Sequence, residues 1–186
     1  NPEDIMLFSF YPTKPVGSID GGMIVSNDYE KIKYYKEATL NGMSFSNNNW
    51  ERKIKFPGWK MYMNSFQAQI GLNNLEKLEK KKKSLKQVRD FYNEKLKYNN
   101  SSDHLYRINV RNRNKFIKHL KSENIVCGIH YKANHRNFVY KFKDDYILPK
   151  TEKCENETVS IPFHECLKEK EIKKVVNVIK NTGLLL

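Results

Sequence analysis

The chain has 186 residues, enough for one ordinary domain or two small ones, and 34 Lys and Arg against 21 Asp and Glu give it a formal charge of +13. Such a charge attracts polyanions, but no nucleic-acid-binding motif accompanies it, so a lysine-rich solvated surface is the favoured interpretation. Its composition argues against a disulfide framework, a cysteine zinc site and a membrane-spanning helix, because no apolar run is long enough and the three cysteines form no Cys-x-x-Cys pair: Cys127, Cys154 and Cys166.

The first predicted elements are two short strands that flank a lysine. The apolar run over residues 5–10 has the length of a buried strand, and Pro12 ends it because proline cannot donate to a sheet ladder. A second apolar run covers residues 23–25, directly after a pair of glycines. Lys14 is therefore expected just past a strand end, where an amine can act as a nucleophile toward a carbonyl compound. A solvated lysine in a polar turn is the competing interpretation, since most lysines lie on the surface.

A helix and an aromatic-rich loop follow. Asp28 fits the N-cap of a helix that ends near Asn41-Gly42. From residue 43 to residue 59, polar residues and a Pro-Gly pair indicate a loop. The loop carries four large aromatic side chains, too many for a simple linker, and is therefore expected to dock on another surface: Phe45, Trp50, Phe56 and Trp59.

The longest predicted element is a helix over residues 64–98. Asn64 with Gln67 three residues later fits a capping box. Apolar residues then recur at helical spacing: Leu72, Leu75, Leu78, Leu85, Val88, Tyr92 and Leu96. A run of four lysines interrupts this stripe at Lys82, so the helix is expected to pass there from one packing environment to another. The run itself is interpreted as a solvated helix face and not as a phosphate site.

The rest of the chain predicts a small αβ unit. Apolar positions indicate a strand near residues 105–110, a helix near 116–120 and another strand near 125–129. An irregular segment and a closing amphipathic helix around 172–179 follow. No metal site is expected, because His130 and His135 lack the spacing of a metal motif and Cys127 does not complete one.

Four blocks of the sequence, in the same order and spacing, resemble the DegT/DnrJ/EryC1/StrS family of pyridoxal-phosphate aminotransferases, which act on nucleotide-linked keto-sugars. The blocks cover residues 9–27, 57–78, 128–131 and 148–162. The resemblance implies an α/β fold, the carboxy-terminal fragment of a fold-type I transferase like aspartate aminotransferase. Residues 1–63 would end the large domain, with the lysine strand and a dimer loop; 64–98 would be a long linking helix and 99–186 a small carboxy-terminal αβ domain.

The resemblance also implies a reaction and partners. The cofactor would be pyridoxal 5′-phosphate, and an amino acid, usually glutamate, would give its amino group to a nucleotide sugar for polysaccharide or glycan biosynthesis. The enzyme would be a cytoplasmic homodimer that shares its active site across the interface, with no specific nucleic acid and no membrane as partner. The family's other cofactor contacts precede the lysine, so this fragment is expected to be inactive alone. A basic nucleic-acid- or polyanion-binding module without catalysis is the alternative.

Three site residues are assigned near the first strand by this resemblance. Lys14 would bind the cofactor through an imine and carry the proton during transamination; it also argues against the family's dehydratases, which have histidine there. Ser9, five residues earlier, matches the position whose hydroxyl contacts the cofactor phosphate. Tyr11 stands where many relatives have histidine, and it is assigned to the substrate, with simple packing as the alternative.

Three further assignments lie later in the chain. Tyr62 occupies a position where an asparagine commonly reaches the partner subunit's cofactor phosphate, so either its hydroxyl or Lys60 is expected to take over that contact. Lys60 is also assigned to the substrate. His130 falls in a segment that lies near the sugar in the family; a core or hinge histidine is the equally weighted alternative.

Overall fold

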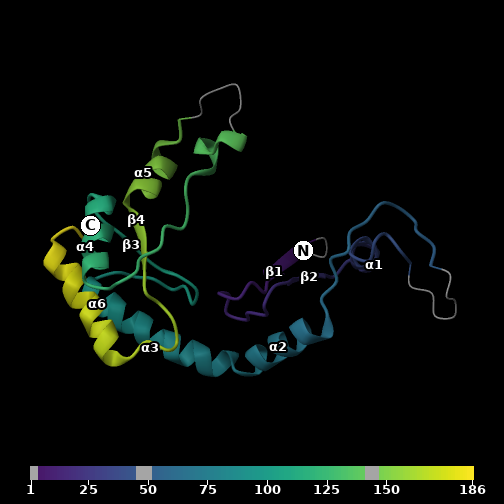
Figure 1. The fold of residues 1–186 in the computed structure, drawn as a ribbon, viewed down its shortest axis with the longest axis horizontal. Helices are drawn as coiled ribbons and strands as arrows, with labels where there is room; N and C mark the ends of the chain where they lie inside the picture. The colour runs from purple at the N-terminus through teal and green to yellow at the C-terminus, as the bar shows by residue number, and fades with distance from the viewer. Residues whose placement is uncertain (1–3, 45–51, 141–146) are drawn as a thin grey trace. The chain divides into compact units, whose positions relative to one another are not determined.

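The structure is a computed structural model that describes residues 4–44, 52–140 and 147–186 (Figure 1). The chain divides into two compact units, Asn1–Leu78 and Glu79–Leu186. Within the described ranges, no helix is both long enough and apolar enough to cross a membrane. The predicted loop aromatics Phe45 and Trp50 lie outside the described residues.

The first unit begins with an antiparallel hairpin, as the apolar runs predicted. Strand β1 (Ile5–Ser9) pairs with β2 (Gly22–Ser26), and Ser9 lies opposite Gly22 at the end next to the connecting turn. The expected burial of β1 is not found, because all five of its residues are exposed. Apolar side chains therefore lie exposed on both faces of this hairpin.

Helix α1 (Tyr29–Ala38) follows β2 and supports the loop after it. The side chain of Asp28 accepts a hydrogen bond from the Lys31 N–H, which confirms the predicted N-cap. Part of the aromatic loop packs on this helix, since the ring of Phe56 stacks on Tyr34 with 5.0 Å between centroids. Trp59, by contrast, is exposed.

The predicted long helix is present as two helices, α2 (Ser65–Glu76) and α3 (Leu78–Leu96), separated at Lys77. Asn64 and Gln67 form the predicted capping box in full. Leu72 and Leu75 are exposed, whereas the stripe becomes buried from Leu85 onward. The environment of the helix thus changes in the region of the lysine run.

The second unit is built on a two-stranded antiparallel sheet, β3 (Tyr106–Asn109) and β4 (Thr158–Ile161). Alternate residues of β3 are buried, so one face of the sheet carries the core and the other is open. Helices α3, α4 (Arg113–Ser122) and α6 (Glu169–Thr182) lie beside the sheet in Figure 1 and supply the core together with the strands. The most deeply buried members are Tyr92, Tyr106, Ile108, Val110, Phe116, Leu120, Val159 and Ile179.

The segment from residue 125 to residue 161 differs from the sequence expectation. Where a strand was expected near 125–129, there is a single bridge between Gly128 and Ser160, which exchange two backbone hydrogen bonds of 2.8 and 2.9 Å. The segment expected to be irregular contains the short 3₁₀ turns Asn134–Arg136 and Phe138–Tyr140, helix α5 (Pro149–Glu157) and β4. Helix α5 has no buried residue, and its sequence therefore lacks the periodic apolar positions from which a helix is predicted.

Candidate active site

Lys14 lies half-buried in the turn that follows β1, as its spacing from the strand predicted. Its backbone N–H donates to the carbonyl oxygen of Tyr11 at 2.9 Å, and the Ser18 N–H donates to the carbonyl oxygen of Phe10 at 2.7 Å. A Cβ at Gly17 would come within 2.5 Å of the Pro12 carbonyl oxygen, so only glycine fits this close turn. The backbone around the lysine is thereby fixed.

Helix α2 anchors the same turn. The fully buried Ser18 donates from Oγ to the Gln67 carbonyl oxygen at 2.5 Å, and the Asn74 side-chain amide donates to the Gly17 carbonyl oxygen at 2.6 Å. Neither of these two anchors, Ser18 and Asn74, was predicted from the sequence. Neither side chain belongs to an apolar period, so the pattern gave no signal for them.

Ser9 and Tyr11 stand between the strand and the lysine. The Ser9 hydroxyl oxygen accepts a 3.4 Å hydrogen bond from the Tyr11 backbone N–H, so its own proton is left for an acceptor such as a phosphate oxygen. Both residues are exposed. A lysine amine can form an imine with an aldehyde, and a hydroxyl can donate a hydrogen bond to a phosphate oxygen. These two side chains of the first unit therefore suit two parts of pyridoxal phosphate, its aldehyde and its phosphate.

Lys60 and Tyr62 lie close to one another in the first unit. The ammonium of Lys60 is 5.9 Å from the centroid of the Tyr62 ring, within reach of a cation–π interaction. Both side chains are exposed, so an ammonium and a phenol are presented together on the surface. The structure thus leaves both candidates for the cross-subunit phosphate contact accessible.

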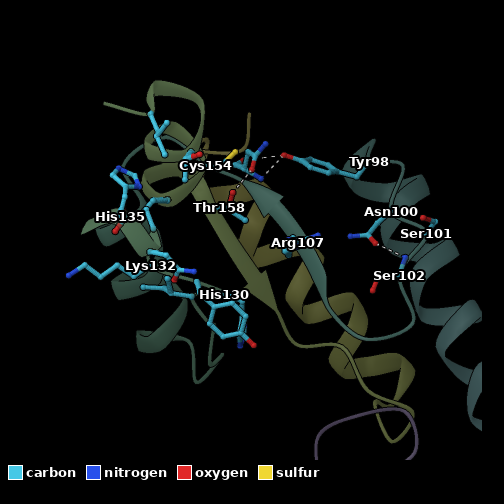
Figure 2. A pocket seen from close by; sticks show the side chains of 18 of the residues that line it. Tyr98, Asn100, Ser101, Ser102, Arg107, His130, Lys132, His135, Cys154 and Thr158 are labelled. Carbon is cyan, nitrogen blue, oxygen red and sulfur yellow. Dashed lines mark hydrogen bonds between the residues drawn. The ribbon is translucent and has the colours of Figure 1, made fainter. Parts of the chain in front are cut away.

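A pocket of about 1210 Å³ opens on the uncovered face of the second unit's sheet. Figure 2 shows Tyr98 and the residues 100–102 on one side, the segment from His130 to His135 on the other, and Arg107 between them. Arg107 and Lys132 are exposed and take part in no ion pair with a described residue. The pocket therefore combines two cations with amide, hydroxyl and phenol groups.

His130 lines this pocket, and its ring lies against Ser160 of β4 and against Gly128 of its own segment. Its Nδ1 lies 2.8 Å from Oγ of Ser160, a buried residue of β4. Its ring also lies over Gly128, where an added Cβ would overlap the imidazole. The sequence indicated His130 as a site residue, whereas Ser160, which lies thirty positions away, was not predicted to belong to the site.

Glu152 ties the His130 segment to α5. Its carboxylate accepts from the Leu148 N–H at 3.1 Å and from Arg136 at 2.8 Å, and it lies 3.3 Å from Nε2 of His135. The Leu148 N–H, followed by the His135 side chain, holds the pKa of Glu152 below its ordinary value. His135 is thus a partner of a carboxylate, and no cluster of three potential metal ligands exists among the described residues.

The three cysteines form no disulfide bond with one another. All three thiols are free, and Cys154 and Cys166 are exposed. Burial raises the pKa of the half-buried Cys127 to about 11, so this thiol stays neutral.

A sequence profile of the DegT/DnrJ/EryC1/StrS aminotransferase family matches residues 1–180. Among curated proteins, an uncharacterised protein of Methanocaldococcus jannaschii is 29% identical over 95% of this chain and 53% of its own length. The UDP-4-amino-4,6-dideoxy-N-acetyl-beta-L-altrosamine transaminase of Campylobacter jejuni is 24% identical over 95% of this chain and 51% of its own length.

Solved structures share the fold. The aminotransferase PseC of Helicobacter pylori, which is involved in the biosynthesis of pseudoaminic acid, superimposes with a TM-score of 0.88 at 23% identity, over 96% of this chain and 53% of its own. The chain therefore spans about half the length of the relatives that it matches.

Proposed function

This chain belongs to the DegT/DnrJ/EryC1/StrS aminotransferase family, whose members depend on pyridoxal phosphate, and we propose that it is the lysine-bearing half of a nucleotide-sugar aminotransferase. The proposed reaction transfers an amino group from an amino acid, glutamate in our proposal, to the keto carbon of a nucleotide-linked sugar, for polysaccharide or glycan synthesis. The UDP-sugar transaminase among the relatives supports the substrate class. The observation that carries the proposal is Lys14, which lies in a glycine-closed turn after β1 within the matched residues.

In this proposal Lys14 holds the cofactor and moves the proton. A primary amine can bind an aldehyde covalently, and once released it can take a proton from a carbon and return it elsewhere. The bound cofactor supplies an electron sink for the carbanion that forms. The anchors on α2 keep the Lys14 backbone in place through both roles. Ser9 would donate its hydroxyl proton to the phosphate, which is a charge-assisted hydrogen bond.

The remaining assignments concern substrate and partner subunit. We assign Tyr11, Lys60 and His130 to the nucleotide sugar, and Tyr62 to the cofactor phosphate across a homodimer interface. The exposed Lys60 and Tyr62 pair supports such a contact, because a cation and a phenol together suit a phosphate. The three free thiols fit the reducing cytoplasm, in which we place the enzyme.

We further propose that the hairpin is completed by the portion of the relatives that this chain does not match. Apolar residues on both faces of a strand are typical of a sheet that is covered on both sides. Here Ile5, Met6, Leu7 and Phe8 are all exposed. In this arrangement residues 1–63 belong to the large domain, residues 64–98 connect the two domains, and residues 99–186 form the small domain. The chain is inactive without the additional portion.

Reductive trapping tests the proposal. The chain is incubated with pyridoxal phosphate, alone and together with a polypeptide that supplies the unmatched portion of the relatives, then reduced with borohydride and digested. We expect a phosphopyridoxyl adduct on Lys14, dependent on the added portion, and none at that position in Lys14→Ala. The matched control is Lys33→Ala, which removes an exposed lysine of α1 that has no assigned role and keeps Lys14. Labelling spread over surface lysines, with salt-dependent retention of DNA or RNA, would instead favour the polyanion-binding alternative.

A further inference from the structure

We infer that Ser160 holds the imidazole of His130 in the tautomer protonated at Nε2, so that His130 offers a hydrogen-bond donor to an acceptor oxygen of the bound nucleotide sugar. Ser160 is a positioning residue in this inference, and His130 is the residue that contacts the ligand. The identity of the ligand rests on the proposed function. The tautomer rests on geometry alone.

The local backbone brings the two side chains together. Gly128 and Ser160 exchange both backbone hydrogen bonds of an antiparallel bridge, which aligns the two ribbons. His130 is two residues beyond Gly128, and its ring returns over that glycine to reach Ser160 Oγ at 2.8 Å. An added Cβ at Gly128 would contact three atoms of the ring, so the absence of a side chain there makes room for the imidazole.

The direction of this hydrogen bond follows from burial. Ser160 is only 4% exposed, and its hydroxyl has no other hydrogen-bond partner among the described residues. If the hydroxyl accepted a proton from Nδ1, its own O–H would be left buried without an acceptor, at a cost of about 1–3 kcal/mol. The hydroxyl therefore donates to Nδ1. A neutral imidazole that accepts at Nδ1 carries its proton on Nε2.

The remaining ring nitrogen is the group left for a ligand. His130 is half-buried and lines the pocket together with Arg107 and Lys132. An N–H donor beside two cations that lack an ion-pair partner in the described ranges suits an acceptor oxygen that carries negative charge or lies next to it. A phosphate oxygen or a sugar oxygen close to the diphosphate has this chemistry.

Nitrogen-15 NMR of the whole 186-residue chain reads the tautomer directly, without cofactor or activity. In long-range ¹H–¹⁵N spectra at mildly alkaline pH, we expect His130 to show the single pattern of an Nε2–H imidazole. In Ser160→Ala the fraction of the Nδ1–H form should rise several-fold, and Ser160→Thr, which keeps a hydroxyl, should restore the single pattern. Thr158→Ala is the matched control, because Thr158 lies on the same strand and lines the same pocket but donates to Asn109.

Two results would overturn the inference. An Nδ1–H imidazole in the unmodified chain, or an unchanged spectrum in Ser160→Ala, would show that Ser160 does not set the tautomer. Titration with UDP-N-acetylglucosamine, in the presence of the polypeptide that supplies the unmatched portion, should shift the His130 Nε2 resonance, and no shift at millimolar concentration would refute the ligand contact. Because the tautomer readout does not involve Lys14, a failed trapping experiment with a correct tautomer would refute the proposed function and the ligand's identity, and the positioning of His130 by Ser160 would stand.

Discussion

Replacing Gly128 by alanine tests the His130 arrangement from its other side. The backbone at Gly128 is not in the left-handed region, so alanine is allowed there and would by itself stabilise the chain by about 0.4–1 kcal/mol through the unfolded state. The new Cβ would, however, overlap the His130 ring, with Nδ1 only 3.1 Å away. The ring must turn away and leave the buried Ser160 hydroxyl without a partner, which costs about 1–3 kcal/mol.

The opposing contributions give a net loss of about 1 kcal/mol in the free energy of unfolding. Urea unfolding followed by circular dichroism measures this loss as a lower midpoint at unchanged slope. Val126→Ala is the control, because Val126 lies in the same segment and is 81% exposed, so its free energy of unfolding should change by less than about 0.5 kcal/mol. A Gly128→Ala variant that is as stable as the parent, with His130 still in a single tautomer, would refute the reasoning.

Three further predictions concern stability. Tyr92→Phe should lower the free energy of unfolding by about 1–3 kcal/mol, because it removes the hydroxyl that donates to the Pro162 carbonyl oxygen. Tyr106→Phe should lower it by about 1 kcal/mol, because the acceptor, Asn93, still receives a hydrogen bond from the Asn100 N–H. Urea unfolding measures both losses. Because the pKa of Glu152 is lower in the folded chain than its ordinary value of 4.5, the ionised carboxylate stabilises the fold fully above pH 4.5. This stabilisation is lost as the pH falls through the lower, folded pKa. Glu152→Gln should therefore flatten the pH dependence of the free energy of unfolding in that acidic range. Asn64→Ala should cost about 1 kcal/mol through the lost capping box, measured by the same method.

Local patterns predicted the elements whose cause is local. Asp28 and Asn64 cap their helices as expected, because a cap is a contact between residues three positions apart. The apolar stripe correctly placed the buried face of α3 at Leu85, Val88, Tyr92 and Leu96. The strand containing Ile108 and the helix containing Phe116 were also found from their apolar positions.

The parts of the candidate site that were missed depend on contacts between distant positions. Ser18 reaches Gln67 across 49 positions, Asn74 reaches Gly17 across 57, and His130 reaches Ser160 across 30. Each is a single polar contact, and a single polar contact repeats with no period that a sequence could reveal. The resemblance proposed Lys14 and His130 as site residues, but it did not supply the groups that contact the turn of Lys14 and the ring of His130.

The burial of β1 illustrates a different limit. Its apolar run correctly predicted a strand, yet all five residues are exposed. An apolar run shows that a segment is suited to burial, but it does not show whether the chain itself contains the residues that would bury it. Since the relatives are about twice as long, we expect the unmatched portion to cover Ile5–Ser9. Hydrogen exchange of the β1 amides should then slow markedly when that portion is added, while the amides of β3, already at the core of the second unit, should be unaffected. Equal protection of β1 with and without the added portion would show that the hairpin is not an interior part of a larger sheet.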